Sequence, residues 1–584
     1  MAFTITNLLD EKSHYFDRFE YIVYKDNFVI NKFLKKFDND KLFYEDDFYI
    51  LVLDGVLLNK IELFKDYESK DILELVKKLY LIKGKEFFNL FRGSFSGALY
   101  NKKTEKWVIY TNHYGDNMLF YYFYKGKYVV SSSVIDIVDI LRLNSIHISL
   151  NEKAFVSMLT YGYMSDDFTY AEEIQRLTPG NYMEIGEDDY SIYTYYRLKN
   201  NVYDLKDKSE SEIIDDLDVL FKKAITLEYR KDMEYGYNHL SELSGGLDSR
   251  MSLWIAKELG FNNITLITFA ESGSLDEKIA KNIARDLGLH IFHLPLDSAK
   301  HILEIDEYTR INYGLSLYGG IGGEKVIMDT FCMDKFGLMH TGQIGDVVIG
   351  SFINSLNQIE DYSLSGLYSE RLINKSRQDE DYIYTLLGVS NYKNKYNNRE
   401  DYLMYVRAFM GCLTSHLFTR KYTEVSSPFL NLELLEYCMS IPIELRINHK
   451  IYKKWIIKKH PNAAKYIWER IGKRIDEKES NVLLNKMIRA LKNPRLVLKK
   501  LGYHIEINEK HRTGMNPMDL WWERNQVLRE TYDNYYKNNI EKIKLNPWMF
   551  EAVKYLYSQG NTLEKMMALT AISSIKLYFD EESD

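Results

Sequence analysis

The chain has 584 residues, which is too long for one hydrophobic core and indicates two or three domains. Hydrophobic residues make up 46% of it, so a packed globular protein is expected rather than a disordered one. The charge is mixed, with 76 Lys+Arg against 84 Asp+Glu and a net charge of −8, which gives no support for nucleic acid as the main partner.

The sequence shows no targeting signal, transmembrane segment or cysteine motif. The first ten residues carry no basic region and no long apolar stretch, so a secretory signal is not expected. The best apolar run, residues 48–58, is short and contains Asp54 and Gly55, which predicts a buried strand and a turn and no transmembrane segment. The three cysteines have no CxxC spacing, so neither a disulfide framework nor a structural zinc site is expected; they are Cys332, Cys412 and Cys438. A cytoplasmic location is predicted.

The first 200 residues show short runs of β-type residues separated by turn-like pieces. Strands are predicted at 21–24, 48–53, 95–100, 107–111, 120–124 and 128–132, with helices near 71–82 and 152–159. This pattern is typical of a layered α+β domain with antiparallel strands.

A polar linker is predicted at 203–208, and beyond it strands and helices alternate. Helices are predicted at 209–228, 249–259 and 276–287, and strands at 236–243, 264–270 and 290–295. Such alternation predicts a parallel sheet with helices on both faces. After about residue 300 the pattern is mainly helical, and 355–400 is polar and weakly periodic, as in an insertion. The predicted domains are 1–200, 209–475 and a helical C-terminal extension at 476–584.

The sequence Ser244-Gly245-Gly246-Leu247-Asp248-Ser249 lies between a predicted strand and a predicted helix. Its glycines permit a tight turn close to a ligand, and the N–H groups that begin the next helix favour an anion. Asp248 would repel a bare phosphate, so a carboxylate here indicates an intervening divalent metal. The loop lacks the Gly-Lys-Ser/Thr of a Walker A motif. An ordinary glycine-rich turn is the alternative interpretation.

This loop resembles the pyrophosphate-binding loop of the asparagine synthetase family, which includes β-lactam synthetase and lasso-peptide cyclases. Four further stretches agree with that family in order. They are Ile267-Thr268-Phe269-Ala270 with Asp276-Glu277; Thr341-Gly342-Gln343-Ile344-Gly345-Asp346; Glu424-Val425-Ser426-Ser427-Pro428-Phe429-Leu430-Asn431 with Ile441-Pro442; and Arg470-Ile471-Gly472-Lys473. The resemblance extends from about residue 40 to residue 475, and its specificity lies in the joint order of the motifs.

The resemblance implies ATP and Mg²⁺ as cofactors and a set of site residues. The implied nucleotide-binding residues are Leu243, Ser244, Gly245, Gly246, Asp248, Ser249, Phe269 and Gly342. Asp248 and Asp346 would meet at the carboxyl ends of neighbouring strands and hold the metal on the phosphates. Lys473 would stabilise the charge that develops on an adenylate or a tetrahedral intermediate. The alternatives are a turn aspartate at 346 and a surface lysine at 473.

The first domain resembles the class II glutamine amidotransferase domain of asparagine synthetase. The matching pieces are Leu53-Asp54-Gly55 with Asn59, residues 91–98, Gly115 with residues 119–122, and residues 174–180. The implied fold is an antiparallel αββα amidotransferase-like domain followed by a parallel α/β ATP-pyrophosphatase (PP-loop) domain with helical additions.

The expected glutaminase nucleophile is missing. In the family, a cysteine directly after the initiator methionine attacks the glutamine amide, and its own α-amine serves as the base. Here that position is Ala2 and the first cysteine is Cys332, so glutamine hydrolysis by the usual route is not expected. Thr4 would need processing that the sequence does not suggest. The nitrogen donor is therefore expected to be ammonia or an amine, supplied by the substrate or by a separate protein.

The synthetase half departs from the family at four positions. Gln343 and Val347 stand where the family has glutamate, Ser426 replaces an arginine, and Asn431 replaces an aspartate. A neutral Gln343 cannot act as a base, so specificity for aspartate is in doubt. Because the ATP-binding elements are better preserved than the acceptor elements, a changed substrate is favoured over a dead enzyme.

The predicted function is an ATP-dependent, AMP-forming amide ligase without its own glutaminase. Its partners would be a small-molecule, peptide or glycan-precursor carboxylate and ammonia or an amine; a homodimer is left open. The rivals are a non-catalytic pseudo-synthetase that binds nucleotide or a partner, and a tRNA-modifying thiolase. The charge balance and the absence of a catalytic cysteine pair argue against the thiolase.

Two minor features of the sequence are a basic segment and the histidines. Residues 486–510 are basic and partly amphipathic, and a solvated helix face is preferred over a membrane-binding helix. The histidines, for instance His290, His293 and His340, show no metal-binding spacing such as HExxH and are interpreted as structural.

Overall fold

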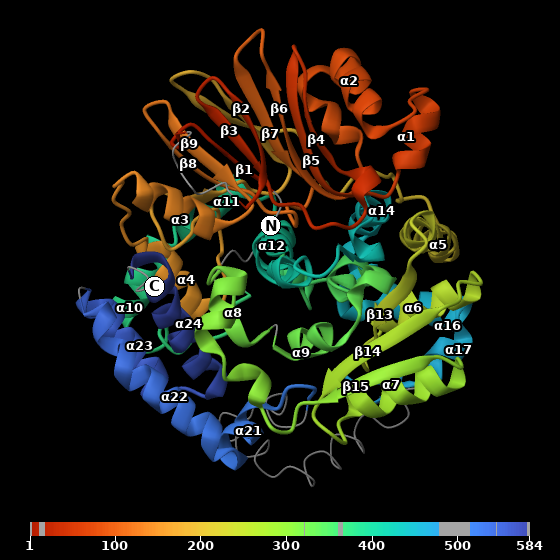
Figure 1. Cartoon of the computed structure of the whole chain (residues 1–584). Coiled ribbons are helices and arrows are strands. Elements are labelled where there is room, and N and C mark those ends of the chain that lie inside the picture. The colour runs from red at the N-terminus through yellow and green to blue at the C-terminus, as the bar shows by residue number, and fades with distance from the viewer. Residues whose placement is uncertain are drawn as a thin grey trace.

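The computed structural model describes residues 3–10, 18–320, 322–359, 366–477, 514–544 and 546–580. Ala2 and residues 486–510 lie outside these residues. The antiparallel strands of the first 200 residues gather at one end of the molecule, and the parallel sheet lies at the other (Figure 1).

Two six-stranded antiparallel sheets form the first domain. One has the order β10-β8-β9-β1-β3-β2 and the other the order β12-β11-β7-β6-β5-β4. The strands of the first are β1 (Phe3–Thr6), β2 (Glu20–Tyr24), β3 (Asn27–Asn31), β8 (Phe120–Tyr124), β9 (Lys127–Ser131) and β10 (Gln175–Arg176). Those of the second are β4 (Leu42–Glu45), β5 (Tyr49–Leu57), β6 (Gly93–Asn101), β7 (Lys106–Thr111), β11 (Asn181–Ile185) and β12 (Tyr190–Thr194).

Alternating side chains place each sheet between two apolar layers. In β5, Ile50 and Val52 join the core between the sheets, whereas Leu51 and Leu53 face the helices α1 (Lys60–Asp66) and α2 (Ile72–Lys83). Helices α3 (Val134–Leu143) and α4 (Glu152–Thr160) contribute to the core on the outer face of the other sheet. The predicted αββα arrangement is therefore confirmed.

The second half contains a five-stranded sheet with all neighbours parallel and the order β15-β14-β13-β16-β17. The strands are β13 (Asn238–Glu242), β14 (Ile264–Ala270), β15 (His290–Pro295), β16 (Phe336–His340) and β17 (Val425–Ser426). The order reverses between β13 and β16, which is the point where an open α/β sheet forms a ligand crevice. The segment 244–247 follows β13 and the segment 341–345 follows β16, so both lie at this point.

The helices around the parallel sheet include α5 (Glu210–Glu234), α6 (Asp248–Glu258), α7 (Leu275–Asp286) and α9 (Gly322–Thr330). Strands 264–270 and 290–295 have the predicted bounds. Helix α5 continues six residues beyond its predicted end at 228. Its last turns bury polar residues, Lys231 and Asp232 among them, and a hydrophobic pattern does not register these.

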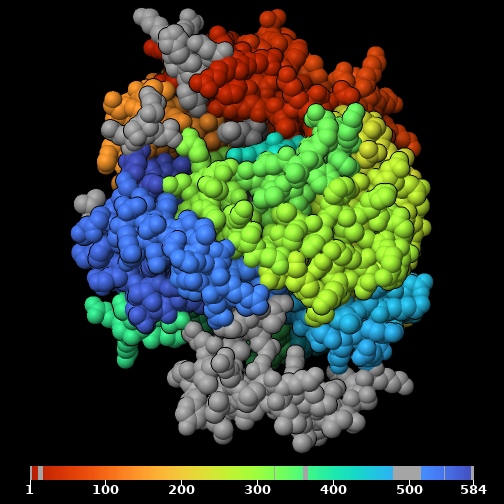
Figure 2. All heavy atoms as spheres, turned by 60° about the horizontal axis from the view of Figure 1, so that its bottom comes forward, coloured from red at the N-terminus to blue at the C-terminus, as the bar shows by residue number. Residues whose placement is uncertain are grey.

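Helices dominate the chain after residue 300, and the C-terminal ones pack onto both halves. They are α21 (Met518–Arg524), α22 (Gln526–Asn539), α23 (Pro547–Gln559) and α24 (Thr562–Phe579). The guanidinium of Arg142 in α3 donates to the carbonyl of Tyr578 at 2.9 Å, and the hydroxyl of Tyr318 donates to that of Tyr532 at 2.6 Å. Figure 2 shows these helices in blue against the green central part. Within the described ranges, no helix is long and apolar enough to cross a membrane.

Candidate active site

The loop between β13 and α6 is braced by its own polar groups. The Ser244 N–H donates to Ser249 Oγ at 3.0 Å, and the Gly246 N–H donates to Ser244 Oγ at 3.2 Å. The Gly245 N–H donates to Asp276 Oδ1, at the start of α7, at 3.0 Å. The loop is thus fixed both to α6 and to the neighbouring helix α7.

Arg250 connects this loop to a distant segment. Its buried guanidinium donates to the carbonyl of Gly245 at 3.1 Å and to the carbonyl of Ile467 at 2.6 Å. It also donates to the carbonyls of Ala463 and Tyr466, both at 3.3 Å. Ile467 begins the hairpin of β18 (Ile467–Trp468) and β19 (Lys473–Arg474), so the guanidinium holds this hairpin against the loop.

Lys473 is the first residue of β19 and is paired in register with Trp468. The turn between the strands requires Gly472, whose φ is +66°. The Glu469 N–H in the same turn donates to the carbonyl of Gly245 at 3.3 Å. The structure therefore brings the hairpin of Lys473 to the loop. Among the described residues, no hydrogen bond or ion pair joins the Lys473 ammonium to Asp248 or Asp346.

Two glycines let the segment after β16 touch the start of α6. A Cβ at Gly342 would lie 2.3 Å from the nitrogen of Ser249, and one at Gly345 would lie 2.7 Å from Cγ of Asp248. Both distances are shorter than side chains tolerate, so glycine is required at each position. The close approach lets the Asp346 N–H donate to Asp248 Oδ2 at 3.1 Å. The structure thus brings together the two carboxylates that sequence analysis selected.

The aspartate pair is only partly neutralised. Asp248 Oδ1 accepts a hydrogen bond from the Tyr452 hydroxyl at 2.8 Å, and Asp346 Oδ2 lies 3.6 Å from Nη1 of Arg470. Burial, followed by the neighbouring charge of Asp346, raises the pKa of Asp248 well above its usual range. The Asp346 side chain is 47% exposed. Within the described part of the chain, Arg470 is the one cation at ion-pair distance, and two adjacent carboxylates with this charge balance could hold Mg²⁺.

The remaining predicted nucleotide-binding residues differ in exposure. Leu243 is buried, and its N–H donates to the carbonyl of Ile267 at 3.0 Å, so its side chain belongs to the core. Phe269 is half-buried, and its ring lies close to the start of α9, where a Cβ at Gly323 would approach it to 2.8 Å.

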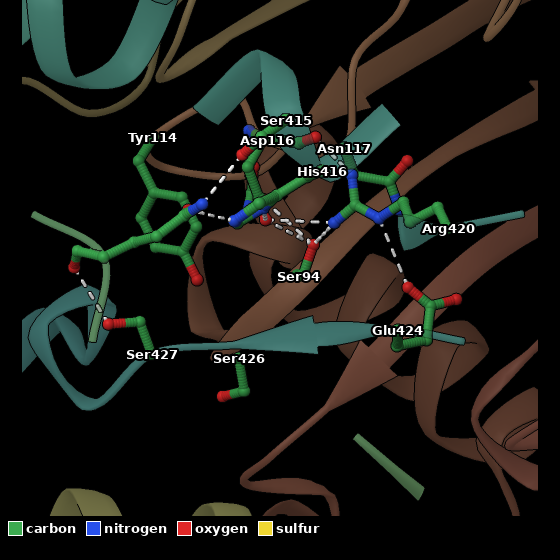
Figure 3. Close-up of polar contacts among 12 residues, drawn as sticks. Ser94, Tyr114, Asp116, Asn117, Ser415, His416, Arg420, Glu424, Ser426 and Ser427 are labelled. Carbon is green, nitrogen blue, oxygen red and sulfur yellow. Dashed lines mark hydrogen bonds and ion pairs between the residues drawn. The ribbon is translucent and has the colours of Figure 1, made fainter. Parts of the chain in front are cut away.

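Gln343 binds residues that lead to the first domain. Its amide Nε2 donates to Ser415 Oγ at 2.7 Å, and its Oε1 lies 2.6 Å from Nε2 of His416. Nδ1 of His416 lies 2.9 Å from Oδ2 of Asp116, which follows β7 (Figure 3). A continuous polar chain therefore joins the segment that carries Asp346 to the amidotransferase-like sheets.

Asp116 is the centre of a buried network between the two halves. Its carboxylate accepts from Ser94 Oγ at 2.9 Å and from Asn112 Nδ2 at 2.6 Å, and it pairs with the Arg420 guanidinium at 3.0 Å. Arg420 also donates to Glu424 at 3.3 Å. Burial alone would raise the pKa of Asp116, but Arg420 and then His416 outweigh it and hold the pKa below its ordinary value.

A second ion-paired set completes this interface. The Lys41 ammonium lies 3.1 Å from Asp54 and 3.3 Å from Glu424, with all three side chains buried. A cavity of about 20 Å³ remains, which is room for about one water molecule. The polar residues that line it are Ser94, Tyr114, Asp116, Ser426, Ser427 and Asn431. Sequence analysis missed this network because its members, such as Asp116 and His416, lie 300 residues apart.

The other departures from the family pattern have local structural partners. Asn431 caps helix α14 (Leu432–Ser440) by accepting from the Leu434 N–H at 3.2 Å, a role that aspartate also fills. The carbonyl of Ser426, in β17, accepts from the Thr341 N–H at 2.9 Å, and Val347 is buried. The neighbouring Ser427, which is not one of the departures, donates from Oγ to the carbonyl of Gln343 at 3.0 Å. These residues support the loop that carries Gln343.

Comparisons with known proteins find similarity to an amidotransferase family and to an asparagine synthetase. The family described as "Glutamine amidotransferase domain" matches residues 34–196. Over 258 residues the chain is 24% identical to "Asparagine synthetase [glutamine-hydrolyzing] 1" of Bacillus subtilis (strain 168), which covers 42% of this chain and 39% of that protein. The match thus spans about two fifths of the relative's length.

Two solved structures share weaker similarity. One is titled "Structure of the allosteric regulatory enzyme of purine biosynthesis", with 9% identity, coverage of 50% of this chain and 74% of that chain, and a TM-score of 0.22. The other is a B. subtilis glutamine phosphoribosylpyrophosphate amidotransferase complexed with ADP and GMP, with 11% identity, coverage of 46% and 67%, and a TM-score of 0.21.

The paired antiparallel sheets and the matched family define a protein with an N-terminal amidotransferase-like domain. Together with the relative from B. subtilis, they show similarity to the asparagine synthetase family.

Proposed function

We propose that this protein is an ATP-dependent, AMP- and pyrophosphate-forming ligase that adenylates a substrate carboxylate and joins it to ammonia or an amine. The observation that carries the proposal is the contact between Asp248 and Asp346 at the crevice of the parallel sheet, where the Asp346 N–H donates to Asp248 Oδ2 at 3.1 Å.

The reaction would proceed in two displacements. A carboxylate oxygen of the substrate attacks the α-phosphorus of ATP, the bond between the α- and β-phosphates breaks, and pyrophosphate leaves. The nitrogen of ammonia or an amine then attacks the acyl carbon, AMP departs with the bonding electron pair, and the nitrogen loses a proton. Holding both reactants in one site supplies much of the rate.

The residues present suit these steps. Mg²⁺, when bound, supplies charge neutralisation on the leaving phosphates. Asp248 and Asp346 would hold the ion, and the Ser244 and Ser249 hydroxyls with the amides that begin α6 would bind the pyrophosphate. Lys473, on the hairpin that Arg250 anchors, would stabilise the negative charge that develops during each displacement.

The first domain would act as a support rather than as a glutaminase. The three cysteines of the sequence, Cys332, Cys412 and Cys438, all belong to the second half, so the first domain offers no thiol. Its Asp116 instead reaches Gln343 through His416. We therefore propose that the domain positions the segment carrying Gly342 and Asp346, and that nitrogen comes from ammonia or an amine.

The acceptor would be a small-molecule, peptide or glycan-precursor carboxylate, and the ATP requirement suits the cytoplasm. Gln343 in place of the family's glutamate argues for a substrate other than aspartate. Because the Gln343 amide is occupied by Ser415 and His416, this side chain would shape the acceptor site without serving as a base.

The test is exchange of radiolabelled pyrophosphate into ATP with a panel of candidate carboxylates. The Asp248→Asn variant should lose about 10²–10³-fold in exchange, because a group that stabilises the developing charge is removed. Asp207→Asn, at an exposed aspartate of the linker, is the matched control and should keep the wild-type rate.

Three results would decide against parts of the proposal. Unchanged exchange in Asp248→Asn would remove the metal role. Tight ATP binding without exchange for any carboxylate would favour a nucleotide-binding pseudo-synthetase. Release of glutamate from glutamine by the purified protein would refute the inactive first domain.

A further inference from the structure

A second cluster of metal-ligand side chains lies in the core where helix α5 crosses strands β13 and β16. Nδ1 of His239 and Nε2 of His340 each lie 2.7 Å from Oδ2 of Asp232. Asp232 is fully buried, and the two histidines are 4% and 1% exposed. Their three ligand atoms lie within 4.8 Å of one another.

Among the residues that the structure describes, no hydrogen-bond partner is found for two buried polar atoms beside this cluster. They are Oε2 of Glu228, one helical turn before Asp232, and Nδ1 of His340. The two atoms point toward one another across 3.6 Å, with both side chains at most 2% exposed. Buried polar atoms are almost always hydrogen-bonded, so this pair requires an explanation.

The surroundings fix the cluster in place. Oδ1 of Asp232 accepts from the Leu338 N–H at 2.7 Å, which leaves Oδ2 for the two histidines. The Tyr229 ring stacks on the His340 ring at 3.9 Å with an interplanar angle of 14°. The orientation of the carboxylate and of one imidazole is thus set by groups outside the cluster, as in metal sites held by outer hydrogen bonds.

We propose that Asp232, His239 and His340 bind a zinc ion that fastens α5 to strands β13 and β16. Coordination replaces the hydrogen bonds of the cluster: each imidazole binds in its neutral form, with its ring proton on Nε2 in His239 and on Nδ1 in His340, so that Nδ1 of His239 and Nε2 of His340 give their lone pairs to the metal. Tetrahedral ligands at zinc distances of about 2.0–2.2 Å lie about 3.3–3.6 Å apart, so each nitrogen needs to move about 0.6–0.9 Å away from Oδ2 of Asp232.

The unpaired atoms support this arrangement. When His340 coordinates through Nε2, its remaining ring proton must be on Nδ1, which faces Glu228. That proton then forms the carboxylate–histidine–metal link common in such sites. One event therefore provides partners for both atoms. Two imidazoles and a carboxylate favour zinc or another transition metal over Mg²⁺, whereas the oxygens of Asp248 and Asp346 favour Mg²⁺.

The site would act on the structure rather than on the reaction. His340 ends β16 and directly precedes Thr341, the first residue of the segment that carries Gly342 and Asp346. A metal at His340 would fix the strand from which that segment emerges, next to β13 and its own loop. Sequence analysis interpreted His340 as structural because its partners lie at 232 and 239 and no short motif contains them.

The test measures zinc in the full-length protein. The chain is partly unfolded with urea and a chelator, refolded with or without Zn²⁺, and analysed by plasma mass spectrometry and thermal melting. We expect one zinc per chain and a higher Tm with zinc. Refolding with Co²⁺ should give the visible absorption of a nitrogen-ligated ion, a readout that needs no variant.

Variants separate ligands from neighbours. Glu228→Gln, which keeps the side-chain shape, should weaken zinc binding by about 10- to 100-fold. His239→Gln should bind no zinc and show no zinc-dependent shift in Tm. His290→Gln, at an exposed histidine of β15 in the same sheet, is the control and should retain both.

The proposal is overturned if the refolded wild type holds substoichiometric zinc, gives no cobalt spectrum and melts at the same temperature with and without Zn²⁺. The cluster would then be a hydrogen-bonded network only. These measurements need neither ATP nor a carboxylate, so their failure leaves the proposed ligase activity untouched, and a failure of pyrophosphate exchange leaves the zinc site untouched.

Discussion

Carboxylates at the domain interface and carboxylates in the crevice have opposite surroundings. At the interface, Asp116 is buried and surrounded by Arg420, His416 and two neutral donors. In the crevice, Asp248 and Asp346 are adjacent to each other, and Arg470 is the one cation at ion-pair distance among the residues that the structure describes. The first arrangement is balanced within the protein. The second has surplus negative charge.

This difference in charge balance indicates a different role for each region. A buried charge that is fully paired tolerates no loss of a partner, which suits a fixed framework. A carboxylate whose pKa is raised by burial and by a like charge is typical of functional sites, because a ligand of the opposite charge relieves the repulsion. The same substitution, aspartate to asparagine, should therefore have different consequences in the two regions.

The largest effect is expected at the interface. Asp116→Asn should lower the free energy of unfolding by about 3–5 kcal/mol, because Arg420 loses its buried counter-charge and His416 loses its carboxylate partner. Urea unfolding followed by circular dichroism measures this change, with Asp207→Asn as the exposed control. A loss below about 1 kcal/mol, the value of a surface ion pair, would remove the contrast between the regions.

In the crevice, binding should suffer instead of stability. Asp346→Asn should weaken Mg²⁺-dependent binding of pyrophosphate by about 100-fold, because a metal ligand is lost. Its unfolding free energy should stay the same or rise by up to about 1 kcal/mol, since repulsion with Asp248 is relieved. Calorimetric titration with and without Mg²⁺ measures the first, and urea unfolding the second. Destabilisation as large as that of Asp116→Asn would contradict the comparison.

The buried framework should also be sensitive to acid. Burial, then the charge of Arg92, lowers the pKa of His113 to about 3. Its unfolded value is about 6.5, so the unfolded chain binds more protons between these values and stability falls as the pH drops below about 6.5. At pH 5 the loss is about 2 kcal/mol. His113→Asn should flatten this slope in unfolding curves measured from pH 7 to 5, whereas His290→Gln should not.

The smallest effect is expected where the two regions meet. Gln343→Glu would place a second carboxylate beside His416, opposite Asp116, and should raise the pKa of His416 by about one unit or more. Burial currently lowers that pKa despite Asp116. Nuclear magnetic resonance of labelled histidines measures the change, with Gln343→Ala as the uncharged comparison. An unchanged pKa of His416 would mean that the side chain of residue 343 no longer contacts this histidine.

The sequence predicted the parallel sheet better than the antiparallel domain. Strands 264–270 and 290–295 were bounded correctly because the amphipathic helix α7 separates them. In the first domain, β1 (Phe3–Thr6) is too short to show a period, and β12 (Tyr190–Thr194) is exposed along its whole length. Neither strand was predicted, because pattern analysis needs a buried face that alternates with an exposed one.

The residues of the candidate site also divide into those that local motifs predicted and those that they did not. Local motifs selected Asp248, Asp346 and the two loops, and the strand order explains why these meet. Contacts that span hundreds of residues could not be predicted: Asp116 reaches His416, and Asp232 reaches both His239 and His340. In each case the partners come from different elements and share no short spacing. Only the packing of those elements joins them.

Arg250 gives the crevice a mechanical property. Its guanidinium donates hydrogen bonds to a carbonyl of the loop after β13 and to a carbonyl at the start of the hairpin of Lys473. Neither segment can move by about an ångström without breaking hydrogen bonds to Arg250, so the two segments should move together. If release of pyrophosphate from the proposed active site displaces the loop after β13, Lys473 should move with it. This movement would then limit the rate of turnover.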